Sequence, residues 1–187
     1  MSALREPAIA EFIIDRAIVW NSDDGSRLYS DGYFGQPIGI RKPKSTEFDK
    51  PLELSLLECA YLIQEGLLIV RESTTHEILA RSDILERGSA LSEYFNDRLA
   101  VYTNLRQRGY VVRPGLKFGT DFAVYEHGPG KDHAPLLVHV IPQRKGVEPL
   151  DIVRAGRLAT SVRKKFIIAT VKENGEIVYY SFVWHKP

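Results

Sequence analysis

Apolar and polar positions alternate in short blocks along the first third of the chain. Residues 9–20 are mostly apolar and β-branched, which is typical of strands. The run Asn-Ser-Asp-Asp-Gly-Ser at 21–26 predicts a turn that leads into residues 27–34. A loop with three prolines follows between Gln36 and Pro51. The pattern therefore predicts short strands and turns before the first helix.

Helical spacing begins at residues 54–66. Ser55 and Glu58 have the spacing of a capping box, and Gly66 is suited to the position after a helix end. Residues 67–71 are then predicted to form a strand.

A longer helix is predicted at residues 89–108, with Gly109 at its end. Its apolar face is expected to consist of Leu91, Tyr94, Phe95, Leu99, Tyr102 and Leu105. We predict a domain boundary just before this helix, near Leu85. It divides the chain into residues 1–85 and residues 86–187.

The remainder of the chain is richer in strand signals. Glu148-Pro-Leu predicts a helix that runs to about Val162, and Glu173-Asn-Gly is typical of a hairpin turn. Strands are expected at 110–113, 122–125, 136–142, 166–172 and 176–184. The predicted fold class is α/β (α+β), with a small mixed N-terminal domain and a C-terminal mixed sheet flanked by helices.

Composition excludes several classes of protein. Of 187 residues, 44% are hydrophobic and 26% are charged, which is close to the globular average and rules out disorder, collagen and coiled coil. The net charge of +1 offers no global attraction for nucleic acid, so any such binding must come from local clusters of charge.

The single cysteine and the apolar stretches bear on location. Cys59 cannot form an internal disulfide, and no Cys/His zinc spacing occurs, which fits a reducing cytoplasm. No signal peptide is visible, and the most apolar stretch, residues 52–70, carries Glu53, Glu58, Gln64 and Glu65. We expect a cytoplasmic protein without a membrane partner.

Two stretches hold candidate chemistry. Residues 115–134 surround a tyrosine and two histidines with four glycines and a proline, and such loops commonly display functional groups. Residues 154–165 carry five basic side chains on or just past the end of the predicted helix. Arg157 and Lys164, seven residues apart, are expected on roughly the same face of this helix. Favourable pairing with the helix dipole is the ordinary explanation for the second stretch when it is taken alone.

Taken together, these stretches resemble the archaeal tRNA-splicing endonucleases. The resemblance covers almost all of residues 90–187 and, more loosely, the helix at 54–65. Several separated motifs occur in the right order, which makes the signal specific. They are Tyr102-Thr-Asn-Leu-Arg-Gln-Arg-Gly-Tyr-Val-Val, Lys117-Phe-Gly-Thr-Asp-Phe, Tyr125, Gly128-Pro, His133-Ala and Arg157-Leu-Ala-Thr-Ser-Val-Arg-Lys. The C-terminal domain is then expected to have a fold similar to restriction endonucleases.

The resemblance implies a catalytic triad of Tyr125, His133 and Lys164. RNA is cut without metal when its own 2′-hydroxyl attacks the neighbouring phosphate, leaving a 2′,3′-cyclic phosphate and a 5′-hydroxyl. His133 suits the acid, because histidine is partly protonated at neutral pH. Lys164 suits stabilisation of the transition-state charge. Tyr125, with an ordinary pKa of about 10, needs a nearby cation to act as the base.

Neighbouring residues offer alternative assignments. His127, His139 and Lys165 are set aside on motif spacing alone, and His139 is interpreted as a core residue of an apolar strand. A metal-dependent phosphodiesterase would need clustered carboxylates. Asp121 and Glu126 are available, but the accompanying acidic-x-Lys pattern is missing. No metal or other cofactor is therefore expected.

RNA contacts are expected outside the triad. In the family, an arginine at the position of Arg157 resembles half of a clamp around a flipped-out base, and Trp184 is our candidate for the other half. Arg41, Lys42 and Lys44 lie among prolines, where exposed positive charges can bind RNA phosphates. A loop of this kind resembles the variant whose catalytic subunit pairs with a separate structural subunit.

The last hairpin bears on assembly. In the family an acidic loop docks into a basic pocket of the opposing subunit, and we assign that loop to the hairpin tip with Glu173 and Glu176. Residues 177–184 form an apolar, β-rich tail suited to pairing with a partner strand. The expected assembly is an α2β2 heterotetramer, with a homotetramer as the alternative.

The resemblance as a whole implies an endonuclease that cuts pre-tRNA at bulge-helix-bulge splice sites. A non-catalytic RNA-binding or structural subunit of the same assembly is the alternative. Structural subunits of the family lose the triad, whereas this chain retains Tyr125, His133 and Lys164.

Overall fold

The computed structural model describes residues 6–131, 136–150, 152–153, 156–157 and 164–181. The chain forms two compact units, Met1–Leu99 and Ala100–Pro187. The division between them falls within helix α4 (Phe95–Gln107). The domain boundary expected near Leu85 stays a prediction.

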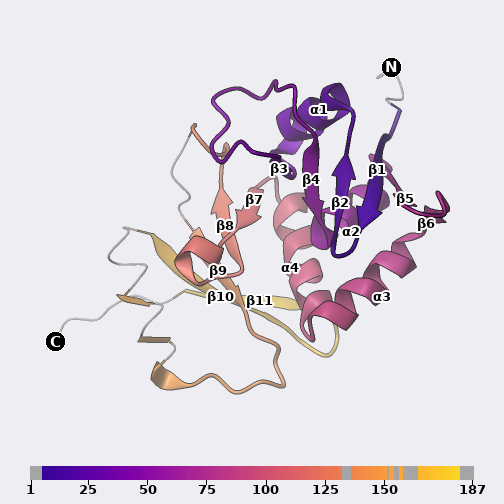
Figure 1. Ribbon diagram of the computed structural model, residues 1–187. Coiled ribbons are helices and arrows are strands. Elements are labelled where there is room, and N and C mark those ends of the chain that lie inside the picture. The colour runs from indigo at the N-terminus through magenta and orange to yellow at the C-terminus, as the bar shows by residue number, and fades with distance from the viewer. Residues whose placement is uncertain (1–5, 132–135, 151, 154–155, 158–163, 182–187) are drawn as a thin grey trace. The chain divides into compact units, whose positions relative to one another are not determined.

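The first unit is built on a six-stranded mixed sheet in the order β3-β4-β2-β1-β5-β6 (Figure 1). Strands β1 and β5 run parallel, whereas the other neighbours in this sheet pair antiparallel. Its strands are β1 (Ala8–Ile13), β2 (Arg16–Val19), β3 (Gln36–Pro37), β4 (Leu52–Ser55), β5 (Leu68–Glu72) and β6 (Ile78–Leu79). The strands predicted at 9–20 and 67–71 are confirmed.

Helices α1 (Ser22–Gly32) and α2 (Leu56–Gln64) pack on this sheet, and α3 (Arg81–Leu91) packs against α2. The capping box at the start of α2 is confirmed. The Ser55 hydroxyl accepts from the Glu58 N–H, and the Glu58 carboxylate accepts from the Ser55 N–H. Gly66 follows the helix end with φ +69, a conformation that favours glycine.

The turn predicted at 21–26 is wrong, because this polar run begins helix α1. The Asn21 side chain accepts from the N–H groups of Asp23 and Asp24 at 2.9 and 3.0 Å. Two acidic residues in the first turn also complement the helix dipole. Leu28 and Tyr29 are buried on the inner side of the helix. Tertiary burial thus turns a polar, turn-like sequence into a helix.

The single helix predicted at 89–108 is also wrong, because the chain forms α3 and α4 with a break between them. Ser92 is extended, with φ −150 and ψ 120, and Leu91 is 62% exposed rather than part of an apolar face. Gly88 lets the Phe95 ring approach α3 so closely that a Cβ at residue 88 would lie 2.4 Å from it. This close packing of Phe95 against Gly88 requires the chain to turn between the helices. The end of α4 before Gly109, which has φ +87, is confirmed.

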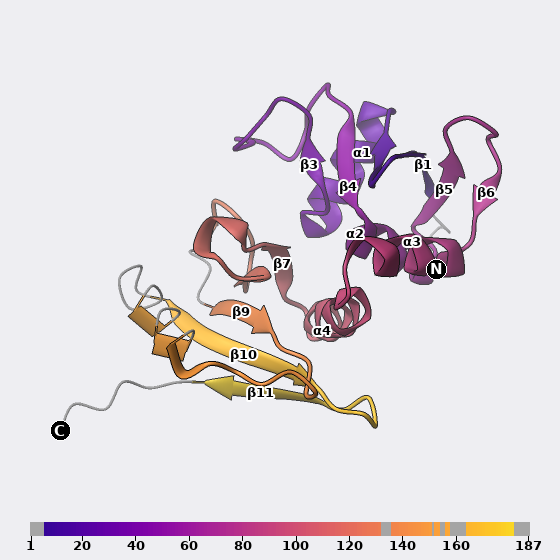
Figure 2. The same ribbon diagram turned by 60° about the horizontal axis from the view of Figure 1, so that its bottom comes forward.

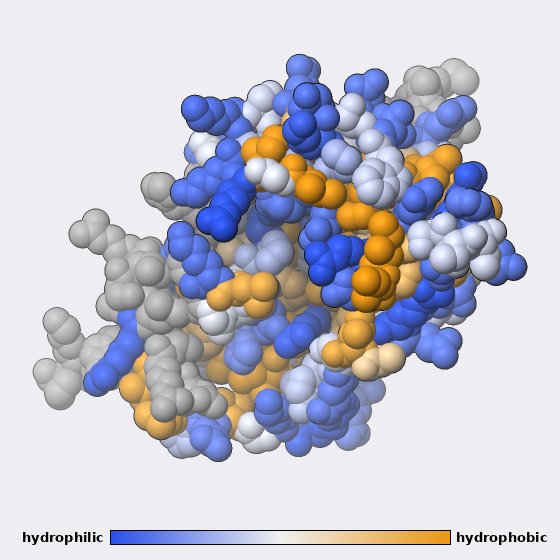
Figure 3. All heavy atoms as spheres, viewed as in Figure 1, coloured by the Kyte–Doolittle hydropathy of each residue, from blue (hydrophilic) through white to orange (hydrophobic). Residues whose placement is uncertain are grey.

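An apolar band crosses the first unit as far as the β1–β2 turn (Figure 3). At this turn Ile14 has φ 60 and is 89% exposed. A β-branched residue rarely adopts this conformation, so the turn carries backbone strain.

The second unit is built on a five-stranded mixed sheet in the order β11-β10-β9-β8-β7. Strands β9 and β10 run parallel, and the other neighbouring pairs are antiparallel. Its strands are β7 (Val111–Pro114), β8 (Phe122–Tyr125), β9 (Leu136–Val140), β10 (Lys165–Val171) and β11 (Ile177–Ser181). Figure 2 shows β9, β10 and β11 side by side. The mixed α/β fold class and these strands are confirmed, and residues 182–184 of the last predicted strand lie outside the described residues.

A short 3-10 helix, η1 (Leu116–Phe118), lies between β7 and β8. Residues 149–150, 152–153 and 156–157 are helical, in agreement with the helix predicted from Glu148. Its predicted end near Val162 lies outside the described residues. Among the helices in the described part of the chain, none combines the length and apolar character needed to cross a membrane.

Candidate active site

The register of the second sheet brings Tyr125 and Lys164 to the same end. Val124 of β8 pairs with Leu136 of β9, and Leu136 pairs with Lys165 of β10. These three residues form one row across the sheet. Tyr125 directly follows Val124, and Lys164 directly precedes Lys165. Both therefore lie one position beyond that row, at the same end of the sheet.

The two residues also share a face of the sheet. Ala123, Leu137 and Phe166 pair with one another in the adjacent row and belong to one core cluster. Tyr125 stands two residues after Ala123, and Lys164 stands two residues before Phe166. Because side chains alternate between the faces of a sheet, both belong to the face of the cluster. Tyr125 is partly buried against this cluster, and Lys164 is half-buried.

The third predicted catalytic residue, His133, lies outside the described residues. It stands three positions before Leu136, the first residue of β9. Trp184, our candidate for the second half of the base clamp, also lies outside the described residues. The catalytic and clamp roles assigned to these side chains stay predictions.

Arg157 is exposed and belongs to the helical segment that precedes β10. Ile152, five residues earlier, packs against the core cluster that Tyr125 contacts. The expectation that Arg157 and Lys164 share one helix is wrong, because Lys164 is not helical and pairing with β9 begins at Lys165. The helix and Tyr125 are instead related by packing on the same core cluster.

His139 is not a core residue, contrary to the sequence interpretation. Its side chain is 41% exposed, and its Nδ1 lies 2.8 Å from Oδ2 of Asp121. That carboxylate also accepts the Val140 N–H at 2.8 Å. Asp121 thus joins the start of β8 to the end of β9. Among the described residues, no three His, Cys, Asp or Glu side chains converge in a way that could hold a metal ion.

The predicted RNA-contacting residues of the first unit lie in a surface loop, residues 38–51, which we call the basic loop. Its ends meet where the Ile38 N–H donates to the Pro51 carbonyl at 2.9 Å. Arg41, Lys42 and Lys44 are exposed, and within the described part of the chain no hydrogen bond or ion pair occupies their side chains. The loop therefore presents three cations to solvent.

The hairpin between β10 and β11 differs from the sequence expectation in its charge. Glu173 and Glu176 are both exposed, but Oε2 of Glu176 lies 2.9 Å from Nζ of Lys172. This hydrogen bond with Lys172 holds the pKa of Glu176 below its usual value. The i,i+4 spacing of Lys172 and Glu176 was the sequence signal that could have predicted this ion pair. Of the two, Glu173 is the carboxylate that no described cation pairs with.

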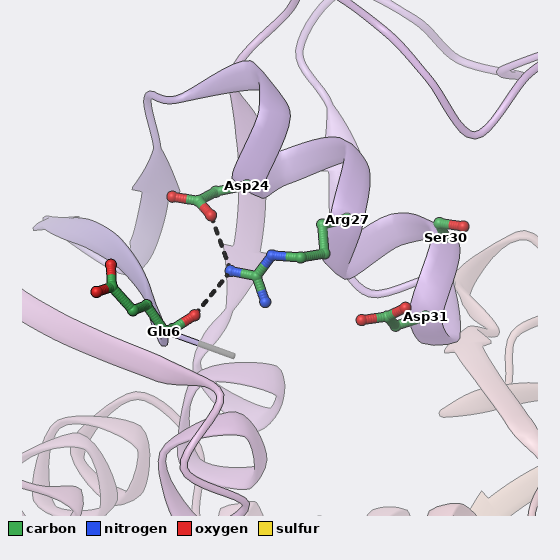
Figure 4. A pocket seen from close by; sticks show the side chains of 5 residues that line it. All are labelled: Glu6, Asp24, Arg27, Ser30 and Asp31. Carbon is green, nitrogen blue, oxygen red and sulfur yellow. Dashed lines mark hydrogen bonds and ion pairs between the residues drawn. The ribbon is translucent and has the colours of Figure 1, made fainter. Parts of the chain in front are cut away.

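A shallow pocket of about 580 Å³ lies elsewhere in the first unit (Figure 4). Arg27 donates to the Asp24 carboxylate at 2.8 Å and to the Glu6 carbonyl at 3.2 Å. The pocket lining also includes Ser30 and Asp31. Three carboxylates around one guanidinium make this pocket unfavourable for a phosphate, and none of the predicted site residues lines it.

Comparison with known proteins decides the family. Residues 8–81 match the family model described as tRNA intron endonuclease, N-terminal domain, and residues 95–179 match tRNA intron endonuclease, catalytic C-terminal domain. The tRNA-splicing endonuclease of Hyperthermus butylicus is 47% identical over 173 residues, covering 92% of this chain and 95% of the relative. The chain belongs to the tRNA-splicing endonuclease family.

Two further relatives support the same family. The tRNA-splicing endonuclease of Pyrobaculum arsenaticum is 40% identical, covering 89% of this chain and 93% of its own. That of Sulfurisphaera tokodaii is 39% identical, with coverage of 95% and 99%. The resemblance to archaeal tRNA-splicing endonucleases is confirmed. The function of this family member is that of a tRNA intron endonuclease.

Proposed function

We propose that this tRNA-splicing endonuclease is a catalytic subunit that cuts pre-tRNA at bulge-helix-bulge sites by attack of the RNA 2′-hydroxyl. The products are a 2′,3′-cyclic phosphate and a 5′-hydroxyl. The observation that carries this proposal is the placement of Tyr125 and Lys164 at one end and on one face of the C-terminal sheet, on strands that flank β9. A base and a cation on one face match what in-line attack on a phosphate requires.

Tyr125 takes the proton of the 2′-hydroxyl. A phenol with an ordinary pKa of about 10 is ionised to only ~0.1% at pH 7. A lysine on the same face favours the phenolate, because opposite charges attract most strongly where water is partly excluded. The half-buried setting of both side chains supports this pairing.

His133 and Lys164 complete the reaction. His133 protonates the departing 5′ oxygen, which its ordinary pKa permits at neutral pH. Lys164 stabilises the negative charge that develops on the phosphoryl oxygens. Arg157 stacks on a flipped-out base, with Trp184 on its other side. The exposure of Arg157 on the helix over the same core cluster supports this role.

The basic loop binds RNA phosphates through Arg41, Lys42 and Lys44, and so widens the range of bulge shapes that are accepted. Three exposed cations without a described counter-ion support this role. We expect their removal to weaken processing of imperfect bulge motifs while regular motifs are still cut. Unchanged cleavage of every substrate would exclude this role of the basic loop.

Assembly completes the proposal. We propose an α2β2 heterotetramer with a separate structural subunit, or alternatively a homotetramer, in the cytoplasm. Strand β11 is at the edge of its sheet and free to pair with a partner strand. Glu173 is the stronger candidate for the docking carboxylate, because Glu176 already pairs with Lys172. Residues 1–85 are proposed as the N-terminal α/β domain and residues 86–187 as the C-terminal catalytic nuclease domain.

The deciding experiment incubates the purified chain with an intron-containing pre-tRNA in EDTA and analyses the fragment ends. Cyclic-phosphate ends support metal-independent attack by an assembly of this chain alone. If nothing is cut, the same tube receives the structural subunit of a related archaeon. Cleavage that then appears supports the heterotetramer, whereas cleavage that needs added magnesium contradicts the mechanism.

A variant separates the catalytic subunit from a structural one. His133→Ala should lower the cleavage rate by about 10²- to 10⁴-fold, the range typical of a lost general acid. His127→Ala, in the same stretch, is the matched control and should cut normally. A structural subunit would tolerate both changes equally.

A further inference from the structure

Two side chains from outside the basic loop hold the ends of its exposed part. Residues 41–47 lie between Ile40 and Phe48. The Gln36 amide donates to the carbonyl of Ile40. On the other side, the Ser26 hydroxyl accepts from the Phe48 N–H at 3.0 Å and donates to the Phe48 carbonyl at 3.1 Å.

The contact at Phe48 is reinforced by ring packing on α1. Its ring meets Tyr29 edge to face, with centroids 5.6 Å apart and an interplanar angle of 80°. A Cβ at Gly25 would lie 3.6 Å from the Phe48 ring, an ordinary contact, and 3.1 Å from the Leu52 Cβ, so the tight approach at Gly25 is to Leu52. A buried helix surface therefore fixes one end of the segment.

Cations predominate in the segment before this contact. Arg41, Lys42 and Lys44 lie there with one carboxylate, Glu47, whereas Asp49 follows the contact and lies 3.9 Å from the Lys50 amine. Among the described residues, no ion pair occupies the three cations. Confining three like charges is unfavourable in an isolated protein and becomes favourable only beside a polyanion.

We propose that Ser26, together with Gln36, is a positioning residue that holds the segment 41–44 in a conformation ready to bind RNA phosphates. This inference rests on the phosphate-binding role proposed above for the basic loop. Because the segment is already held before RNA binds, less entropy is lost when its three long side chains are immobilised on RNA. Neither residue touches the RNA.

The experiment measures KM and kcat for an imperfect bulge motif at several salt concentrations, using the assembled enzyme. Ser26→Ala should raise KM by about threefold to tenfold with kcat unchanged. It should also make the salt dependence of KM shallower, as neutralising Arg41, Lys42 and Lys44 to Gln does, because fewer phosphates are contacted. A purely structural defect would not change the salt dependence.

Three controls accompany this variant. Ser30→Ala makes the same chemical change on the same helix, at an exposed residue that does not contact Phe48, and should behave as the unaltered enzyme. Ser26→Thr retains the hydroxyl and should restore a normal KM. Gln36→Ala tests the other anchor independently should Ser26→Ala fold poorly.

The outcomes distinguish the RNA-binding role of the basic loop from the positioning role of Ser26 and Gln36. If neutralising the three cations changes neither KM nor salt dependence, the RNA-binding role of the loop is wrong. If neutralisation weakens binding but Ser26→Ala and Gln36→Ala do not, the loop binds RNA and the positioning role is overturned. The positioning role also fails if Ser26→Ala raises KM as much in the neutralised loop as in the unaltered one.

Discussion

The two units hold their candidate functional residues in different ways. In the first unit, two side chains hold the exposed part of a surface loop at its ends: Gln36 binds the nearby Ile40, and Ser26 binds Phe48, which is distant in sequence. In the second unit, the backbone hydrogen bonds of β8, β9 and β10 align Tyr125 with Lys164. Each unit has a mixed sheet with one parallel pair of strands, so the difference does not follow from sheet type.

This difference matches the precision of placement that phosphate binding and proton transfer each require. Attraction between cations and phosphates falls off gradually with distance, so a loop held at a few points is sufficient. Proton transfer needs hydrogen-bond distances, which a strand ladder maintains. The loop can therefore vary in length and charge without disturbing the residues assigned to catalysis.

The largest expected effect tests the alignment in the second unit. Lys164→Ala should lower kcat by about 10²- to 10³-fold, because the transition-state charge loses its cation. Lys165→Ala is the matched control, since the pleat directs this exposed neighbour to the opposite face. Single-turnover cleavage measures both variants. Equal losses would show that the assignment of faces is wrong.

The next effect tests side-chain support in the first unit. The buried Glu58 carboxylate accepts the N–H groups of Gly35 at 2.7 Å and Ser55 at 2.9 Å. Glu58→Ala leaves both N–H groups without this partner and should lower the free energy of unfolding by about 3 kcal/mol. Denaturant unfolding measures the loss. Glu65→Ala, at the exposed end of the same helix, should change it by less than about 0.5 kcal/mol.

A smaller effect tests the loop that precedes β8. A Cβ at Gly115 would lie 2.4 Å from the Thr120 hydroxyl oxygen and 2.8 Å from the Phe122 backbone. Gly115→Ala should therefore cost about 2 kcal/mol in thermal or denaturant unfolding. Gly146→Ala is the control, because nothing lies within 4 Å of its added Cβ. Equal stability of the two variants would mean that the loop adapts freely.

The smallest effect concerns alkaline pH. The Tyr179 hydroxyl donates to Oδ1 of Asn104 at 2.8 Å, and burial raises the pKa of this tyrosine above 10.0, partly opposed by Arg108. The unfolded state therefore loses its proton first as pH rises. The contribution of Tyr179 is fully present below pH 10.0 and is lost as pH rises through the higher folded pKa.

Tyr179→Phe removes both this ionisation and the hydrogen bond. We expect about 1 kcal/mol or less of lost stability at neutral pH, and a flatter decline as the pH rises above about 10. Unfolding free energies at a series of pH values measure this. A decline as steep as that of the unaltered chain would assign the alkaline loss to other groups.

Local signals in the sequence were sufficient for most elements. The capping box at Ser55 and Glu58 and the strand-forming residues of β8 and β10 are local signals, and these elements were predicted correctly. Helix α1 was missed because its polar first turn resembles a turn until Leu28 and Tyr29 are buried. The break before α4 was missed because it depends on the contact between Gly88 and Phe95.

The candidate site, too, was predicted from the sequence only in part. Motif order identified the family, since its chemistry requires the same residue types at similar spacings. It did not reveal that Asp121 holds His139, or that Lys164 precedes a strand rather than ending a helix. Ser26 and Gln36 carry no sequence signal for their role, because hydroxyl and amide side chains occur throughout ordinary surfaces.

The sequence by itself determined the family, the mixed α/β class and which side chains are available for chemistry, because these depend on composition and local order. Only the tertiary structure decided which of them share a face and which loops are held, as with Tyr125 and Lys164. Strand register and long-range packing set those relations through contacts between residues far apart in the chain.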